Sequence, residues 1–322
     1  MEDKWFELVG RESASRVLSE WEEDRSGERD RARSGFWGSF WQRINRIKIR
    51  KKKRNRPVLS LCLLLIVMAG CLGCELFIPK DPLYMDLANY AHEPCREFWF
   101  GTDTMGRDLF SMIWYGGRIS LLIGFTATAV STLIAIIFGA VSGLSPRWLD
   151  ALLMRLSEIL LSVPGLLLVV LLQAVLGKAN VWSISFVIGI TGWMGIAKVV
   201  RTETKQIRNS EYVTASKCMG GGFFHVLWNH LAPNFISSIM FMVVMNVRSA
   251  ILSESTLSFM GIGLPLDIIS WGSMLTLADK ALLSGAWWMI LFPGAFLIVT
   301  LVCITNIGSA LKDGAGSRES NL

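Results

Sequence analysis

The chain has 322 residues, of which 52% are hydrophobic and only 18% are charged, and its mean hydropathy is +0.44. Soluble domains usually carry about a quarter charged residues, so this composition excludes an ordinary soluble domain and predicts that much of the chain faces lipid or a large interior. The net charge of +6 does not indicate a nucleic-acid-binding protein. Lys and Arg residues gather before Pro57 and between apolar segments, as positive-inside bias predicts, and not among aromatic residues.

Residues 1–56 form a predicted cytoplasmic N-terminal region. Residues 1–35 are polar and of mixed charge, and because they offer little apolar surface to bury we expect them to be partly disordered. Apolar residues at helical spacing follow from Phe36 to Ile47, and a basic run covers residues 50–56. This pattern predicts a basic amphipathic helix on an anionic membrane surface, and a plain positive-inside flank is the alternative.

Six apolar segments of about the length that crosses a bilayer follow this region. They cover residues 59–78, 118–144, 150–176, 181–200, 233–255 and 286–307. Pro164-Gly165 interrupts the third segment, and Gly139-x-x-x-Gly143 in the second offers a face where helices can approach closely. The predicted fold class is therefore an all-α polytopic membrane protein with about six transmembrane helices.

The charges of the connecting segments predict the orientation. The expected inner loops share an excess of basic residues, which are Arg147, Lys198, Arg201, Lys205, Arg208 and Lys217. The segment 84–115 is polar and net acidic, which suits the outer side. We therefore expect both termini in the cytoplasm, a transmembrane domain over residues 57–316 and a short cytoplasmic tail over residues 317–322.

One inner segment differs from an ordinary loop because it reads as a short helix capped at both ends. Asn209 or Ser210 can accept a hydrogen bond from the first turn, and Gly220 suits a helix exit in the left-handed conformation. Pro233 suits the first turn of the next helix. A capped helix between two membrane spans indicates a docking element, although a plain loop helix is the alternative.

The residues of this segment resemble the EAA loop of ABC importer permeases, here residues 201–234. The matching residues are Glu211, Tyr212, Val213, Ala215, Gly220, His230, Pro233 and Asn234, and Ser216 keeps the small size of the family's second Ala. Their spacing resembles the second (C-type) permease of the dipeptide, oligopeptide and nickel subfamily.

Further motifs extend the resemblance over most of residues 57–316. Residues 100–108 look like the outer GTDxxGRD element of peptide permeases, which places an outer motif at Gly101, Asp103, Gly106, Arg107 and Asp108. Residues 254–263 resemble the family's E-x-x-LSFLGLG segment. Single residues match the family at the entry to the third span, namely Asp150, Met154, Arg155 and Pro164. Others match in the run before the EAA loop, namely Trp193, Ala197 and Arg201.

The resemblance implies a type I ABC importer fold and a permease subunit in the plasma (inner) membrane of a prokaryote. The helix 210–220 is then a coupling helix, in which Glu211, Tyr212, Ala215, Ser216 and Gly220 dock on a cytoplasmic ATPase, while His230, Pro233 and Asn234 shape the loop. Implied partners are a homologous permease, two ABC ATPase subunits and an extracytoplasmic substrate-binding protein. The implied solute is a peptide or a related small solute, with nickel or a metal chelate as the alternative.

The sequence shows no catalytic constellation of its own. It lacks a P-loop, so we expect ATP hydrolysis in partner subunits, no enzymatic activity in this chain, and no cofactor. The three His residues have no metal-ligand spacing, and the six Cys residues suit apolar packing, so no metal site is predicted. Arg248 and Glu254 lie along the fifth apolar segment, where ionisable groups either line a pathway or pair with a neighbouring subunit.

Two other classes of protein remain as rivals. An ion-coupled secondary transporter predicts acidic residues at mid-membrane depth and internal repeats, neither of which is clear here. Uptake by vesicles that lack ATP would favour it. A membrane receptor or scaffold would use the same loop for a partner other than an ATPase, and would purify without one.

Overall fold

The computed structural model describes residues 57–78, 80–208, 216, 218–220, 232–265, 267–281 and 285–319. The amphipathic helix and basic run expected within residues 1–56 lie outside the described residues, as does most of the loop 209–231. Within the described ranges the chain is helical, and its extended pairing is limited to an isolated bridge between Thr102 and Asp108. The all-helical fold class is therefore confirmed for this part of the chain.

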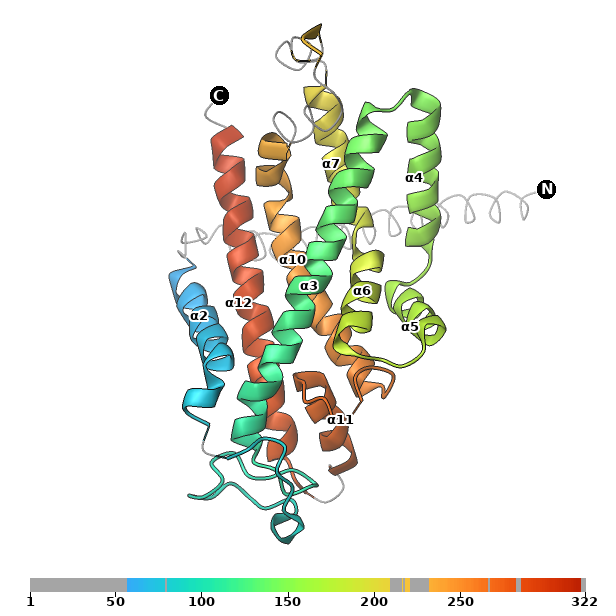
Figure 1. Cartoon of the computed structure of the whole chain (residues 1–322). Helices are drawn as coiled ribbons and strands as arrows, with labels where there is room; N and C mark the ends of the chain where they lie inside the picture. The colour runs from blue at the N-terminus through green and yellow to red at the C-terminus, as the bar shows by residue number, and fades with distance from the viewer. Residues whose placement is uncertain are drawn as a thin grey trace, which may run out of the picture. The chain divides into compact units, whose positions relative to one another are not determined.

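Nine α-helices are described in residues 57–319, and Figure 1 shows their arrangement. In chain order they are α2 (Val58–Leu72), α3 (Leu109–Leu144), α4 (Arg147–Ser162), α5 (Gly165–Leu176), α6 (Val181–Gly192), α7 (Met194–Ile207), α10 (Ala232–Phe259), α11 (Trp271–Ala281) and α12 (Trp288–Glu319). Short 3₁₀ turns lie at Cys74–Leu76 and Leu87–Asn89. We call the end where α7 finishes and α10 begins the loop end, and the end where α3 begins the motif end (Figure 1).

Two helices, α3 and α12, are long and apolar enough to cross a membrane alone. Two bent pairs, α4 with α5 and α6 with α7, raise the number of candidate spans among the described residues to four. The remaining expected spans differ from a simple apolar helix. At 15 residues α2 is about 22 Å long, short of the ~30 Å hydrocarbon core. The 28-residue helix α10 carries Arg248 and Glu254 in its second half.

The second apolar helix begins earlier than the sequence indicates. Asp108 caps α3, because its carboxylate accepts hydrogen bonds from the backbone N–H of Ser111 at 3.0 Å and from its hydroxyl at 2.5 Å. Hydropathy places the start of this span at Arg118, nine residues later, because residues 109–117 include polar residues and glycines. These residues pack inside the protein and do not form a loop, since Leu109, Met112 and several others are buried.

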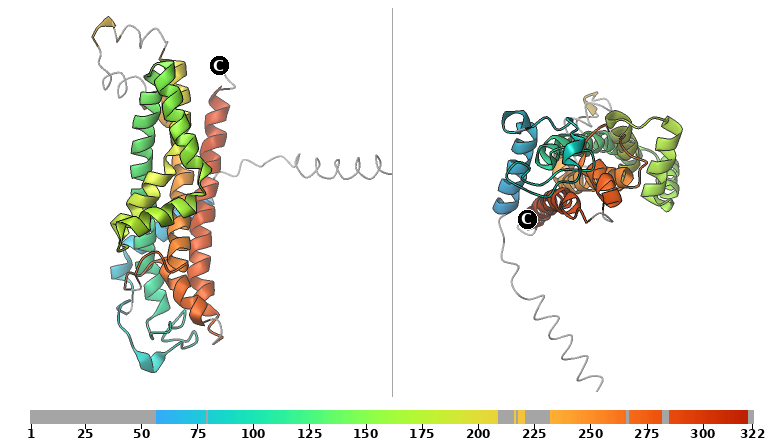
Figure 2. Two further views of the ribbon diagram at one scale, coloured as in Figure 1. Left: turned by 90° about the vertical axis from the view of Figure 1, so that its right-hand side faces the viewer. Right: turned by 90° about the horizontal axis from the view of Figure 1, so that it is seen from below.

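The third apolar segment breaks where Pro164-Gly165 predicts. Val163 takes the extended conformation (φ −84°, ψ 130°) that a following proline favours, and α5 leaves α4 at 92°. Figure 2 (left) shows α5 running across the bundle while α4 runs along it. The fourth segment bends by 46° at Trp193, between α6 and α7, which the sequence does not indicate.

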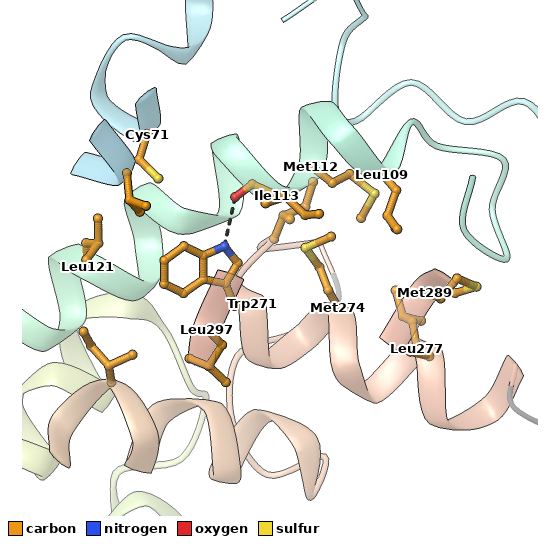
Figure 3. Close-up of a cluster of buried hydrophobic side chains, with 14 of the residues drawn as sticks. Cys71, Leu109, Met112, Ile113, Leu121, Trp271, Met274, Leu277, Met289 and Leu297 are labelled. Atoms are coloured by element: carbon orange, nitrogen blue, oxygen red, sulfur yellow. Dashed lines mark hydrogen bonds between the residues drawn. The ribbon is translucent and has the colours of Figure 1, made fainter. Parts of the chain in front are cut away.

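A buried cluster at the motif end joins α2, α3, α10, α11 and α12. Its largest fully buried side chain is Trp271, whose indole N–H donates a hydrogen bond of 3.0 Å to the carbonyl oxygen of Ile113 (Figure 3). Met274 and Leu121 lie close to the same ring (Figure 3). The segment between the fifth and sixth apolar segments therefore contains a helix, α11, that is packed into the core.

Close contact between α3 and α7 depends on Gly139 and Gly143, as their spacing predicts. A Cβ atom added at Gly139 would lie 2.6 Å from the carbonyl oxygen of Ala197 and 2.8 Å from Cβ of Val200. At Gly143 it would lie 2.7 Å from Cβ of Thr204. The two helices therefore approach more closely than any larger residue permits.

We expect Gly139→Ala to lower the free energy of unfolding by about 1–3 kcal/mol, because backbone atoms of α7 cannot move away from the added methyl group without a wider shift. Thermal unfolding of the purified protein in detergent measures the change. Gly165→Ala is the matched control, because a Cβ at Gly165 meets no atom of the described residues within 4 Å. Equal unfolding temperatures for the two variants would contradict this account of the contact.

Candidate functional site

At the loop end, Asp150 joins three helices through its carboxylate. Arg201 donates from Nε to Oδ1 at 2.5 Å and from Nη2 to Oδ2 at 2.6 Å, and Lys205 donates to Oδ2 at 2.5 Å. The hydroxyl of Ser142 donates to Oδ1 at 2.7 Å. Asp150 is buried, with 6% of the residue exposed, so this is a desolvated charge held by two cations. We call these four residues, from α3, α4 and α7, the Asp150 cluster.

Sequence reasoning matched Asp150 and Arg201 to family patterns separately, but gave no sign that they meet. They are 51 positions apart, and their pairing depends on how α4 and α7 face each other. A second contact nearby comes from Arg208, which follows α7 and donates to the carbonyl oxygen of Gly143 at 3.2 Å. The end of α7 is therefore tied to both neighbouring helices just before the loop begins.

Within the loop 209–231 the structure describes Ser216 and Cys218–Gly220. Ser216 is buried, and Cys218 is exposed. Gly220 has φ of +87°, which confirms the left-handed conformation expected there. The other residues expected to dock or shape the loop, Glu211, Tyr212, Ala215 and His230, lie outside the described residues.

The next helix begins where the sequence predicts. α10 starts at Ala232, which places Pro233 and Asn234 in its first turn. Proline is favoured there because the first-turn N–H groups have no partner within the helix.

At the motif end, the five residues of the predicted outer motif form one compact turn. Arg107 donates from Nε to Oδ2 of Asp103 at 2.8 Å, and both residues are 1% exposed. The other oxygen of Asp103 accepts the backbone N–H of Arg107 at 2.9 Å. Gly101 and Gly106 have φ of +78° and +73°, and Asp108 caps α3. The charged groups of Asp103 and Arg107 therefore bond each other inside the turn and stabilise its shape.

The same turn is fastened to the start of α12. The indole N–H of Trp288 donates to the carbonyl oxygen of Thr102 at 3.1 Å, and the hydroxyl of Thr102 donates to the carbonyl oxygen of Asn89 at 2.6 Å. Beside it lies a hollow of about 340 Å³. Its lining residues are largely polar: Lys80, Asp81, Tyr84, Asp86, Asn89, Glu97, Phe98, Gly106 and Asp108.

Glu254 is fully buried between α3, α10 and α11. Oε1 accepts hydrogen bonds from the hydroxyls of Ser270 at 2.8 Å and Ser258 at 3.0 Å. Oε2 accepts weaker ones from Ser120 at 3.3 Å and Ser255 at 3.4 Å. Four hydroxyl donors compensate for burial of the carboxyl group. Glu254 therefore does not line an open pathway on this chain, and its serine partners were not foreseen from the sequence.

Arg248 takes no part in the hydrogen bonds found for Glu254, although the two residues were grouped as pathway or pairing candidates. Its Nε atom is buried and has no hydrogen-bond partner among the described residues. The ion pairs found within the described part of the chain do not include it. A cation within an apolar helix needs compensation, so Arg248 differs from Glu254, whose carboxyl group is already hydrogen-bonded within this chain.

Among the described residues, no group of three or more His, Cys, Asp or Glu side chains lies close enough to hold a metal ion. Arg155 and Glu158 form an ion pair at 3.1 Å on an exposed face of α4. The cysteines Cys71 and Cys74 are buried as free thiols. The pair of Arg155 and Glu158 stabilises α4 locally, and the two buried thiols contribute to packing.

The helical fold, the Asp150 cluster at the loop end and the turn 101–108 at the motif end define a class of protein. It is a helical membrane protein in which buried charges anchor the helix before the loop between α7 and α10. The chain belongs to the family of binding-protein-dependent transport system inner membrane components, whose pattern matches residues 135–313.

Curated relatives extend the similarity over nearly the whole chain. The dipeptide transport system permease protein DppC of Bacillus subtilis is 34% identical, over 94% of this chain and 94% of its own. The oligopeptide transport system permease protein OppC of Bacillus subtilis is 36% identical, over 82% and 86%. The corresponding OppC of Haemophilus influenzae is 34% identical, over 87% and 89%.

Proposed function

We propose that this chain is a permease subunit of an ATP-driven importer for peptides or related small solutes, and that it forms the translocation path with a homologous permease. The observation that carries the proposal is its family membership together with similarity to dipeptide and oligopeptide permeases over more than four-fifths of both chains. The chain moves solute and leaves ATP hydrolysis to partner subunits. Nickel or a metal chelate is the alternative solute, and analysis of the solute on a co-purified binding protein distinguishes the two.

The proposed topology has six spans with both termini in the cytoplasm. The spans are α2, α3, the pair α4–α5, the pair α6–α7, α10 and α12, with α11 on the outer side. The basic inner segments and the acidic segment 84–115 support this orientation. The chain then divides into a cytoplasmic region 1–56, a permease domain 57–316 and a tail 317–322, in the plasma membrane of a prokaryote.

The proposed docking element is the helix 210–220 at the loop end. Glu211, Tyr212, Ala215 and Ser216 lie in a cleft of an ABC ATPase subunit, and Gly220 provides the exit turn. His230, Pro233 and Asn234 direct the chain back into α10. Closure of two ATPase subunits on ATP then moves the loop and rocks the spans between inward- and outward-facing states.

An extracytoplasmic binding protein delivers the solute at the motif end. The hollow beside residues 101–108 and the segment 257–271 offer the surface for it. The buried ion pair of Asp103 and Arg107 stabilises the turn that forms part of that surface. Arg248 faces the path or an acidic residue of the homologous permease, and Glu254 holds α11 in place.

The exposed thiol of Cys218 gives a direct test of the docking element. In a variant with Cys62→Ser and Cys95→Ser, Cys218 is the one exposed cysteine, since Cys71, Cys74 and Cys303 are buried. We expect a short thiol-reactive crosslinker, applied to inverted membrane vesicles, to join this variant to an ATP-hydrolysing subunit.

The control adds Cys218→Ser and should lose the crosslinked product. Crosslinks that reach only proteins without ATPase activity would contradict the proposal and favour the receptor or scaffold. Uptake by vesicles without ATP would instead indicate an ion-coupled transporter.

A further inference from the structure

Helix α4 is weakly packed against the rest of the chain. Of its 16 residues only Asp150, Met154 and Ser157 are buried. Its large apolar side chains face outward, with exposed fractions of 69% for Trp148 and 58% for Leu152. Figure 1 shows α4 at the edge of the helices, on the side away from α2 and α12. The ties of α4 to other helices therefore depend strongly on the residue at its start, Asp150.

The strongest ties at Asp150 lead to α7. Arg201 and Lys205 are four positions apart, so they project from one face of α7, and both bond the same carboxylate. The guanidinium uses two N–H groups on the two oxygens, which fixes its orientation as well as its distance. Asp150 is buried while the two cations are partly exposed, so the pair is screened less than a surface salt bridge.

The face of α7 next to Arg201 and Lys205, formed by Ala197, Val200 and Thr204, packs against α3. Gly139 and Gly143 let the backbones of α3 and α7 approach closely, independently of the Asp150 cluster. Removal of the charged contact therefore leaves the packing of α3 on α7 intact. It weakens the attachment of α4, which keeps Met154 and Ser157 as buried residues and Leu160 as a partly buried contact with the core.

The position of α7 in the chain gives the contact a mechanical role. α7 ends at Ile207, and Lys205 lies in its last turn, directly before the loop 209–231. Any displacement of that loop acts first on this turn. Asp150 then connects the turn to α4, and through the 92° bend to α5, which packs against α6.

We propose that Asp150, Arg201 and Lys205 form a clamp that makes α4 move as one body with α7, so that displacement of the loop reaches α4 and α5. The three residues are positioning residues, since the role proposed for them acts through the helices that they join. This inference rests on the proposed coupling function of the loop. It adds the route by which the movement enters the membrane helices.

The clamp is tested by the distance between α4 and α7 in the complete importer, purified with its partner permease and ATPase subunits. Spin labels at Leu152→Cys on α4 and Gln206→Cys on α7 use two exposed positions, after Cys62, Cys95 and Cys218 are replaced by serine. Pulsed electron paramagnetic resonance measures the distance without nucleotide and after trapping with ATP and vanadate. We expect one narrow distribution that is the same in both states.

Asp150→Asn keeps the shape of the side chain but removes its charge, and should broaden or shift the distribution in the trapped state. The double variant Asp150→Arg/Arg201→Asp restores one pair of opposite charges and should narrow the distance distribution again. If Asp150→Asn acted by loss of local folding, this second exchange would not narrow the distribution. Glu158→Gln is the matched control, because Glu158 is an exposed acid on α4 whose partner Arg155 lies on the same helix. It should leave the distribution unchanged.

Two results would overturn the inference. One is a distance between the labels on α4 and α7 that changes between the nucleotide-free and trapped states when the clamp residues are wild type. The other is a distribution that stays narrow and unshifted in Asp150→Asn. Either result leaves the proposed function standing if ATPase subunits co-purify and vanadate traps the nucleotide. Failure of the ATPase subunits to co-purify with the wild-type chain contradicts the proposed function itself. The two failures are therefore distinguishable.

Discussion

Replacement of Gly220 by proline is expected to abolish solute uptake while the protein still inserts into the membrane. Gly220 has φ of +87°, and the pyrrolidine ring holds φ near −65°, so proline cannot adopt the backbone conformation of the exit turn. The direction of the chain after the proposed docking helix then changes. We expect ATPase subunits to be lost from the purified complex, which co-purification and uptake assays in the same membranes measure together.

Two milder variants at Gly220 separate the backbone requirement from steric effects. A Cβ atom at this position meets no described residue within 4 Å, so within the described part of the chain the positive φ is the constraint on a side chain here. Gly220→Asn should retain most uptake, because asparagine tolerates the left-handed conformation, and Gly220→Ala should retain less. Uptake by Gly220→Pro at the wild-type rate, or complete loss in Gly220→Asn, would refute this explanation.

Replacement of Glu254 by alanine is expected to produce the largest loss of stability. The substitution leaves a cavity between α3, α10 and α11 and removes the acceptor for four buried serine hydroxyls. Cavity formation and unsatisfied hydroxyls together predict a loss of about 3 kcal/mol or more. Thermal unfolding in detergent and the amount of protein in the membrane measure the effect.

Glu254→Gln should be much less harmful. Its carbonyl oxygen can keep the bonds from Ser258 and Ser270, and its NH₂ group can donate to Ser120, which also accepts the backbone N–H of Trp271 at 3.2 Å. Glu158→Ala, at an exposed position, is the surface control. If Glu254→Ala unfolds at the same temperature as Glu158→Ala, the serine-bound carboxyl group is not a support of α11.

The two ends of the protein use buried charge for different purposes. At the motif end, Asp103 and Arg107 are four positions apart and stiffen one turn, so their pairing is local. At the loop end, Asp150 and Arg201 are 51 positions apart and connect separate helices. A local pair fixes the shape of a surface, whereas a pair between helices determines which helices can move together.

The sequence by itself determined the features that a few neighbouring residues control. Apolar runs located the helices, Pro164 located the break in the third span, and Gly220 and Pro233 located the turn and the next helix start. The spacing of Gly139 and Gly143 indicated a close helix contact, although not which helix makes it. Each of these signals acts through the backbone within about one helical turn, so no knowledge of distant residues is needed.

Only the tertiary structure decided which buried polar groups meet. The partners of Asp150 and Glu254 come from other helices, and a helix places a side chain on a given neighbour only once its rotation and depth are fixed by packing. The early start of α3, whose first turns are buried in the core, and the 46° bend at Trp193 likewise became visible only in the tertiary structure. Hydropathy indicates that a segment is buried in lipid or protein, but it contains no information about the direction in which each side chain points.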